Sequence, residues 1–179
     1  MILNRKLRQP THVIFFLTCL VILLNACDQA PVSNKTETAK DSSTAPNFAL
    51  KSISNSDLSL SKFDNQAVLL NFWSPGCNAC ESELAFFDQL YLKYQNKNLA
   101  VIGINVGGTA QYARNYLEEK NLQLSFPIGT DPVMEISELY GIRSIPATFL
   151  LNQQHKIYKK VKAIESEEAF EKLVQSLLN

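Results

Sequence analysis

An apolar segment runs directly into two cysteines in the stretch Val68-Leu69-Leu70-Asn71-Phe72-Trp73-Ser74-Pro75-Gly76-Cys77-Asn78-Ala79-Cys80. A buried strand that ends at such a pair, followed by a helix that begins at the first thiol, is the geometry that thiol–disulfide exchange needs. Only a thiolate attacks a disulfide, and the free N–H groups at a helix N-terminus favour the anion. We therefore expect Cys77 to be the nucleophile. Cys80, one turn into the helix and more shielded, should be the resolving thiol.

Apolar and amphipathic segments alternate on both sides of this stretch, and no internal repeat is visible. Short apolar runs bounded by polar turns predict strands, and apolar residues spaced three or four apart predict helices. We expect strands at residues 48–53, 58–60, 68–72, 99–105, 148–151 and 156–162, and helices at 77–94, 110–120, 132–140 and 166–178. This order predicts an α/β sandwich whose sheet is partly parallel and ends in an antiparallel hairpin.

Residues 1–26 have the features of an export signal. A cluster of basic residues precedes a short apolar stretch (13–24), which suits a signal peptide better than a membrane span. The following Leu24-Asn25-Ala26-Cys27 resembles a bacterial lipoprotein cleavage box, in which Cys27 becomes the lipidated N-terminus. An uncleaved signal anchor is the alternative. Residues 27–45 are polar and predict a lipidated, flexible tether ahead of one folded domain at residues 46–179.

Two further features of the N-terminal region bear on location and partners. Asp28 directly follows the expected lipidated cysteine and resembles an inner-membrane retention signal, so we expect the domain at the periplasmic face of the inner membrane.

Loss of residues 1–26 removes three basic residues and no acidic ones, which leaves 14 basic against 17 acidic residues and a net charge of −3. The sequence has no basic patch for a phosphate backbone, so nucleic-acid binding is not expected.

The cysteine count narrows the chemistry. Once the signal is removed and Cys27 is modified, only Cys77 and Cys80 remain as an exchangeable pair. A disulfide that closes so short a loop stabilises little, which favours a redox-active bond over a structural one. Zinc would need further ligands, and the mature chain offers only His155 as a histidine, so no metal site is expected. The pair Gly107-Gly108 lacks the spacing of a dinucleotide-binding loop, and no cofactor is expected.

Four segments carry a resemblance to a known family: residues 71–80, Glu83, Gly103-Ile104-Asn105-Val106-Gly107, and residues 140–150 (Tyr-Gly-Ile-Arg-Ser-Ile-Pro-Ala-Thr-Phe-Leu). With the lipoprotein-like start, they make residues 46–178 similar to the TlpA/ResA/CcmG family of membrane-tethered thiol–disulfide oxidoreductases. The resemblance implies a thioredoxin-like three-layer sandwich. Such a fold has a central mixed sheet with helices on both faces and, in this family, an N-terminal β-hairpin.

The resemblance also implies roles for residues outside the cysteine pair. Pro146 matches the family's cis-proline, which faces the dithiol, and the preceding Ile145 would offer its backbone to an extended substrate. Glu83 lies one helical turn after Cys80, and in ResA-like proteins a glutamate there is linked to tuning of the thiols and to proton transfer. A solvated helix glutamate is the alternative. Trp73 would shape the surface on which substrates dock, or would serve packing alone.

These features predict a thiol–disulfide oxidoreductase that mainly reduces disulfides of exported proteins. The resemblance suggests apocytochrome c as a substrate, and a membrane thiol–disulfide electron donor of the DsbD/CcdA type that re-reduces the pair. Gly76 and Ala79 replace the aromatic residue and the proline that are usual in the family, which leaves the redox potential open. The alternatives are an SCO-like copper chaperone and a peroxiredoxin-like thiol peroxidase. The first would need cysteines four apart and a nearby histidine, and the second a Pro-x-x-x-Ser/Thr-x-x-Cys pattern that is missing here.

Overall fold

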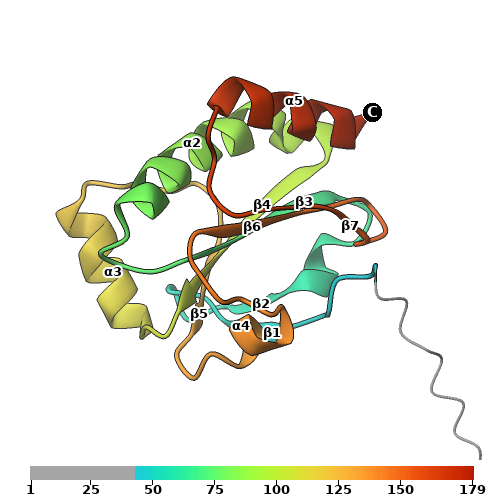
Figure 1. Ribbon diagram of the computed structural model, residues 1–179. Helices are drawn as coiled ribbons and strands as arrows, with labels where there is room; N and C mark the ends of the chain where they lie inside the picture. The colour runs from blue at the N-terminus through green and yellow to red at the C-terminus, as the bar shows by residue number, and fades with distance from the viewer. Residues whose placement is uncertain (1–42) are drawn as a thin grey trace, which may run out of the picture. The chain divides into compact units, whose positions relative to one another are not determined.

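A computed structural model describes residues 43–179 of the chain (Figure 1). These residues form a mixed sheet, a small hairpin and the helices that cover them. In chain order the elements are β1 (Ala49–Lys51), β2 (Asp57–Ser59), η1 (Leu60–Phe63), β3 (Ala67–Trp73), α2 (Asn78–Tyr94), η2 (Gln95–Lys97), β4 (Leu99–Val106), α3 (Ala110–Glu119), β5 (Ile128–Asp131), α4 (Glu135–Leu139), β6 (Ala147–Leu151), β7 (Ile157–Val161) and α5 (Glu167–Leu178). Within these residues, no helix is long and apolar enough to cross a membrane.

The main sheet has five strands in the order β5-β4-β3-β6-β7. Strand β3 pairs in parallel with β4, which pairs in parallel with β5, whereas β6 runs antiparallel to both β3 and β7. All seven residues of β3 are buried, because this strand has a neighbour on each side and a layer on each face. The cysteine pair therefore follows a strand that is buried along its whole length.

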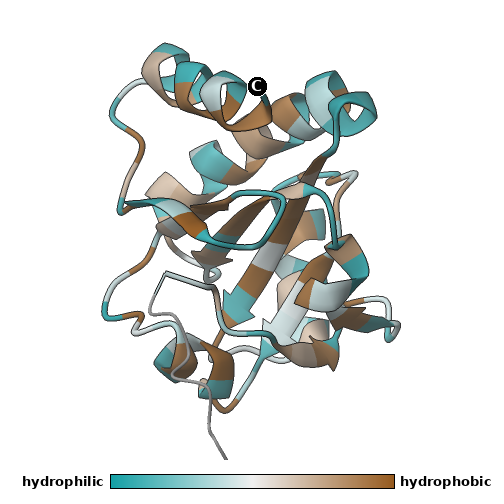
Figure 2. Cartoon of the chain, turned by 90° about the vertical axis from the view of Figure 1, so that its right-hand side faces the viewer, coloured by the Kyte–Doolittle hydropathy of each residue, from teal (hydrophilic) through white to brown (hydrophobic). Residues whose placement is uncertain are grey.

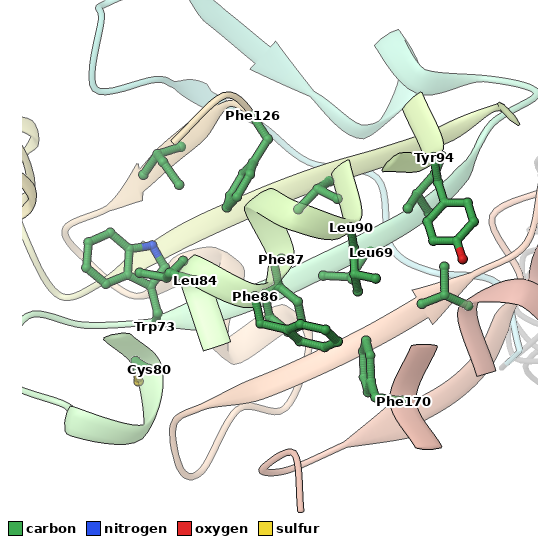
Figure 3. Packing of buried hydrophobic residues seen from close by; sticks show 14 of the residues in the cluster. Leu69, Trp73, Cys80, Leu84, Phe86, Phe87, Leu90, Tyr94, Phe126 and Phe170 are labelled. Carbon is green, nitrogen blue, oxygen red and sulfur yellow. The ribbon is translucent and has the colours of Figure 1, made fainter. Parts of the chain in front are cut away.

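Helices and smaller elements cover both faces of the sheet, so the fold has three layers. Helices α2 and α5 lie on one side, and α4 lies with the β1–β2 hairpin on the other (Figure 1). The first face is filled by aromatic and aliphatic side chains from the sheet, α2, α3 and α5 (Figure 3). The second contains side chains from the sheet, β2, η1 and α4. Hydrophobic residues are concentrated on the central strands and on the inward faces of the helices (Figure 2). The predicted thioredoxin-like sandwich is confirmed.

The N-terminal hairpin is also present. Strands β1 and β2 pair antiparallel, and Ser52 forms an isolated bridge with Gly129 at the edge of the main sheet. Folded structure begins earlier than Pro46, since the Ala45 amide donates a 2.8 Å hydrogen bond to the His155 carbonyl and Ala45 is buried. The expected signal at 1–26, the lipidated Cys27 and most of the tether at 27–45 lie outside the described residues.

Two predictions around residue 130 were wrong. Residues Ile128–Asp131 form a strand, β5, that the sequence pattern did not indicate, because four residues that include Gly129 and Asp131 have little strand signal of their own. Pairing with β4 holds these residues in the extended conformation of a strand. The helix expected at 132–140 contains only Glu135–Leu139, because the preceding Met134 has a left-handed backbone (φ 61°). Asp131 holds this short helix by accepting hydrogen bonds from the backbone amides of Ile136 and Ser137.

Candidate active site

The loop between β3 and α2 sets the position of the cysteine pair. Gly76, directly before Cys77, has a left-handed backbone (φ 83°), although a side chain added there would meet no atom within 4 Å. The backbone conformation, and not a lack of space, therefore makes glycine the suitable residue. The turn is closed by the Cys77 amide, which donates to the Ser74 carbonyl at 3.3 Å. An aromatic residue, usual here in the TlpA/ResA/CcmG family, would be strained in this conformation.

Cys77 is the N-cap of α2, and its sulfur accepts a hydrogen bond from the Cys80 amide at 3.2 Å. The two cysteines form a disulfide with an S–S distance of 2.07 Å. Cys77 is partly exposed, whereas Cys80 is only 1% exposed. The expected difference in shielding is therefore present. In the reduced protein, the unpaired amides and the positive end of the α2 dipole would favour a thiolate on Cys77.

Trp73 ends β3 and is fully buried, in the same hydrophobic cluster as Cys80 (Figure 3). Its ring packs against Tyr116 of α3 with a centroid distance of 6.3 Å. An indole with no exposed surface cannot contact a docked protein, so the predicted substrate contact is not present in this structure. The packing alternative is the one that the structure shows. Trp73 therefore supports the cysteine loop from within the hydrophobic core.

Ile145 and Pro146 lie beside the end of β3. The Ile145–Pro146 peptide bond is cis, as the resemblance implied. Strand β6 begins at the next residue, Ala147, which pairs with Phe72 of β3, so this loop and the cysteine loop share one end of the sheet. Pro146 is buried, but Ile145 is partly exposed and packs against the hydrophobic clusters on both faces. Of the two, Ile145 is the residue with surface to offer to a bound chain.

Glu83 is buried, with only 6% of the residue exposed, so it is not the solvated helix glutamate of the alternative interpretation. Its Oε1 accepts a 2.9 Å hydrogen bond from the Ile164 amide, whereas its buried Oε2 has no partner. Burial raises the pKa of Glu83 to about 7, against the opposing effect of the Ile164 hydrogen bond. This carboxyl group can therefore gain or lose a proton near neutral pH.

A cavity of about 250 Å³ lies beside Glu83 and reaches Ala79, one of the two residues between the cysteines. It is lined by Ala79, Ser82, Glu83, Phe86, Ala163, Ile164 and Glu167. The loop that follows β7 and the start of α5 supply one wall, and the first turns of α2 supply the other. A water molecule or a side chain that enters this cavity would come close to the Glu83 carboxyl group, which would otherwise be enclosed.

Tyr116 and Glu81 were not predicted as site residues. The Tyr116 hydroxyl donates a hydrogen bond to Glu81 Oε1, and the Lys120 ammonium lies 3.3 Å from the same oxygen. No sequence motif signals this contact, because it joins α3 to the first turn of α2 and depends on how the two helices pack. His155, the only histidine of the expected mature chain, lies in the turn between β6 and β7. Among residues 43–179, no three His, Cys, Asp or Glu side chains are grouped as metal ligands.

Comparison with known proteins gives relatives of similar sequence and fold. A model of the AhpC/TSA family matches residues 42–160. Thiol-disulfide oxidoreductase ResA of Oceanobacillus iheyensis is 30% identical over 161 residues, which cover 86% of this chain and 83% of the relative. The protein of the same name from Bacillus cereus is 28% identical over 144 residues, which cover 80% and 82%.

Solved structures agree with these relatives. A putative thiol:disulfide interchange protein DsbE from Chlorobium tepidum superposes with a TM-score of 0.71 at 25% identity, over 76% of this chain and 96% of that one. StoA from Bacillus subtilis superposes with a TM-score of 0.61 at 25% identity, over 74% and 98%. This chain therefore belongs to the AhpC/TSA family, in which it is a thiol–disulfide oxidoreductase of the ResA and DsbE type.

Proposed function

We propose that the protein reduces disulfides of exported proteins at the periplasmic face of the inner membrane. The observation that carries this proposal is the unequal exposure of the two sulfurs at the start of α2. Cys77 is open to a partner, while Cys80 is buried directly behind it and already within bonding distance. Such a pair can form a mixed disulfide through one sulfur and release it through the other.

The exchange starts from the dithiol. The Cys77 thiolate attacks one sulfur of a substrate disulfide, which forms a mixed disulfide and releases the other substrate sulfur as a thiolate. Cys80 then loses its proton and attacks Cys77 Sγ, which releases the second substrate thiolate and leaves the Cys77–Cys80 disulfide. Two electrons pass to the substrate, and two protons follow them. A membrane thiol–disulfide donor of the DsbD/CcdA type would return two electrons to the pair.

Glu83 would serve the second step. Cys80 is buried and needs a base before it can attack, and Glu83 stands one helical turn further along α2. A carboxylate with a pKa of about 7 can take a proton from a thiol and release it again near neutral pH. The cavity that reaches Ala79 and Glu83 would give that proton a route to solvent. Ile145 would meanwhile pair its backbone with the substrate segment.

The proposed location rests on the N-terminal sequence. The cleavage box at residues 24–27, with Asp28 after it, supports a lipid on Cys27 and retention at the inner membrane. A multiply acylated cysteine would hold the protein firmly, whereas a single chain would not. Exported proteins, such as apocytochrome c, would be the substrates at this site. Replacement of Cys27 by Ser should abolish incorporation of labelled fatty acid into the protein without loss of disulfide exchange.

A trapping experiment tests the exchange mechanism. Cys80→Ser cannot release a mixed disulfide, so substrate and donor proteins should accumulate as adducts on Cys77 in native membranes. Mass spectrometry of the adducts would identify both. Cys77→Ser is the matched control and should trap nothing and reduce nothing. Full activity of Cys77→Ser would show that the assigned nucleophile is wrong. If the adducts contained thiol proteins that are being oxidised, and no reducing donor, the proposed direction of electron flow would be wrong.

A further inference from the structure

Tyr116 of α3 touches the cysteine loop at three places. Its ring packs against Trp73, where the loop begins, and its hydroxyl donates to Glu81 on the first turn of α2, where the loop has ended. The backbone of Gly76, directly before Cys77, lies near the same hydroxyl group. Tyr116 is only 9% exposed, whereas the Glu81 side chain that it contacts is 26% exposed. One side chain therefore spans the whole loop that presents the nucleophile.

Glu81 and Lys120 complete this arrangement. The Lys120 ammonium lies 3.3 Å from Glu81 Oε1 and 5.5 Å from the centre of the Tyr116 ring. The hydrogen bond from Tyr116 and the charge of Lys120 lower the pKa of Glu81, so the carboxylate is ionised and held by both partners. We call Tyr116, Glu81 and Lys120 the loop triad. It keeps a negative charge close to Cys77 but turned toward α3.

A second triad of the same composition lies at the other end of α2. Tyr94 and Lys93 both contact Glu171 of α5, with Tyr94 Oη and Lys93 Nζ each 2.5 Å from Glu171 Oε1. Tyr94 is the last residue of α2, whereas the cysteine pair stands at its first turn. This remote triad has the same chemistry as the loop triad, but it is placed at the opposite end of the helix from the disulfide. It offers a control for any effect of losing such a hydrogen bond.

We propose that Tyr116 is a positioning residue for the nucleophile: it fixes the Gly76–Cys77 loop against α2 and α3 and holds the Glu81 carboxylate away from the Cys77 sulfur. This role goes beyond the proposed reduction of protein disulfides, but it rests on Cys77 as the attacking thiol.

The proposed role of Tyr116 predicts the direction in which the pKa of Cys77 changes in each variant. Without the hydroxyl, Glu81 is free to turn toward Cys77, and the loop that directs the Cys80 amide at the sulfur is less firmly held. Both effects disfavour the Cys77 thiolate, so its pKa should rise in Tyr116→Phe. Glu81→Gln removes the negative charge and leaves Lys120 unpaired, so it should lower the same pKa. Opposite shifts from two residues of one triad are not expected from a loss of stability.

Other titratable groups near the pair stay unchanged in these variants. They are Glu83 on α2, Glu119 beside Lys120 on α3, Glu167 at the start of α5 and Arg143 in the loop before Pro146. Glu83 faces the cavity on the Ala79 side of the helix, whereas Glu81 faces α3. A shift caused by Glu81 or Tyr116 therefore adds to a background that is the same in every variant.

The test measures the ionisation and redox equilibrium of Cys77 in the full-length protein. The reduced protein is alkylated across a range of pH, and fragmentation mass spectrometry assigns the label to Cys77 or to Cys80, which lies three residues away on the same peptide. The same variants are equilibrated with glutathione redox buffers. In Tyr116→Phe we expect an apparent pKa higher by about half a unit and a disulfide favoured about threefold. In Glu81→Gln we expect changes of similar size in the opposite direction.

Tyr94→Phe and Glu171→Gln in the remote triad are the controls, and neither should change either measurement. Tyr94→Phe should lose about as much stability as Tyr116→Phe, which separates a general loss of stability from an effect on Cys77. Wild-type values in both loop-triad variants, or shifts of the same sign in both, would overturn the proposal. If Tyr116→Phe does not fold, Glu81→Gln decides, because it leaves the packing of Tyr116 intact. Neither measurement needs a protein substrate, so failure of the proposed function would be seen separately.

Discussion

At the scale of single residues, Glu83 is the group whose behaviour depends most on burial. Its sequence position one turn after Cys80 is compatible with a surface glutamate, like Glu81 on the same helix. The loop at Ile164 covers it and satisfies one oxygen only. The result is a pKa of about 7, against an ordinary value of 4.5. The energetic cost of ionising Glu83 falls on the folded state, because only there is the carboxyl group enclosed.

This cost predicts a pH-dependent effect of Glu83→Gln. The folded-state pKa is raised above the unfolded-state value, so the folded protein binds this proton more tightly and loses stability as the pH rises from about 4.5 to about 7. The free energy of unfolding of Glu83→Gln, relative to that of wild type, should therefore rise by up to about 3 kcal/mol across this pH window. Below and above the window, the difference between the two proteins should not change with pH. Urea unfolding of the oxidised proteins at several pH values measures the difference.

The exposed Glu118→Gln is the control, and its difference from wild type should be constant over the same pH range. A constant difference for Glu83→Gln as well would mean that Glu83 ionises in the folded protein as it does in the unfolded chain. The exchange activity provides a second readout. If Glu83 serves as the base for Cys80, the variant should also release mixed disulfides more slowly than wild type at neutral pH.

At the scale of elements, the short helix α4 depends on a single buried carboxylate. Asp131 ends β5 and accepts hydrogen bonds from the Ile136 amide at 3.2 Å and from the Ser137 amide at 2.8 Å. The Ser137 hydroxyl donates a third at 2.6 Å. A helix of five residues has too few internal hydrogen bonds to be stable alone. Strand β5 therefore holds α4 through Asp131, and α4 in turn covers one face of the sheet.

We expect Asp131→Ala to lower the free energy of unfolding by about 3 kcal/mol, because it leaves two buried amides and a hydroxyl without an acceptor. Amide hydrogen exchange should accelerate most at Ile136 and Ser137. Thr109→Ala removes the exposed N-cap of α3, a single 3.2 Å hydrogen bond, and should cost about 1 kcal/mol. Equal losses in the two variants would show that α4 is held by its packing and not by Asp131.

At the scale of the whole molecule, the sheet separates two hydrophobic clusters. Cys80 belongs to one of them, and Cys77 packs against the same cluster. That cluster joins α2 to α5 through Phe170, whose ring lies 6.1 Å from Phe86 and 5.5 Å from Phe87, centre to centre. The loop that contains Ile164 runs between β7 and α5, so its cover over Glu83 depends on this packing. The closing helix is far from the active site along the chain, yet it forms part of its wall.

Phe170→Ala should lower the free energy of unfolding by about 3–5 kcal/mol, since the ring is 3% exposed and its loss leaves a cavity between α2 and α5. Thermal and urea unfolding measure the loss. Leu92→Ala is the matched control on α2, because Leu92 is 53% exposed, and its effect should stay within about 0.5 kcal/mol. A loss below about 1 kcal/mol in Phe170→Ala would mean that α5 is only loosely attached to the sheet.

The sequence by itself determined the fold class, the order of most elements and the cysteine pair. These depend on local patterns: the buried run before Trp73, the helical spacing after Cys77, and the turn residues between strands. The cysteine pair is recognisable for the same reason, since both thiols lie within one helical turn. Strand β5 was missed because it is only four residues long and contains Gly129 and Asp131, residue types that are depleted in strands, so its order depends on pairing with β4.

Only the tertiary structure decided which side chains are enclosed and which helices meet. Trp73 is buried although an indole before the active loop is equally compatible with an exposed docking surface. Glu83 is covered by Ile164, and Tyr116 reaches Glu81, through contacts between segments that are distant in the sequence. Burial and pKa depend on every neighbour that excludes water. The identity of the reacting atoms is therefore a local property of this chain, whereas the control of their protons is a property of the packed molecule.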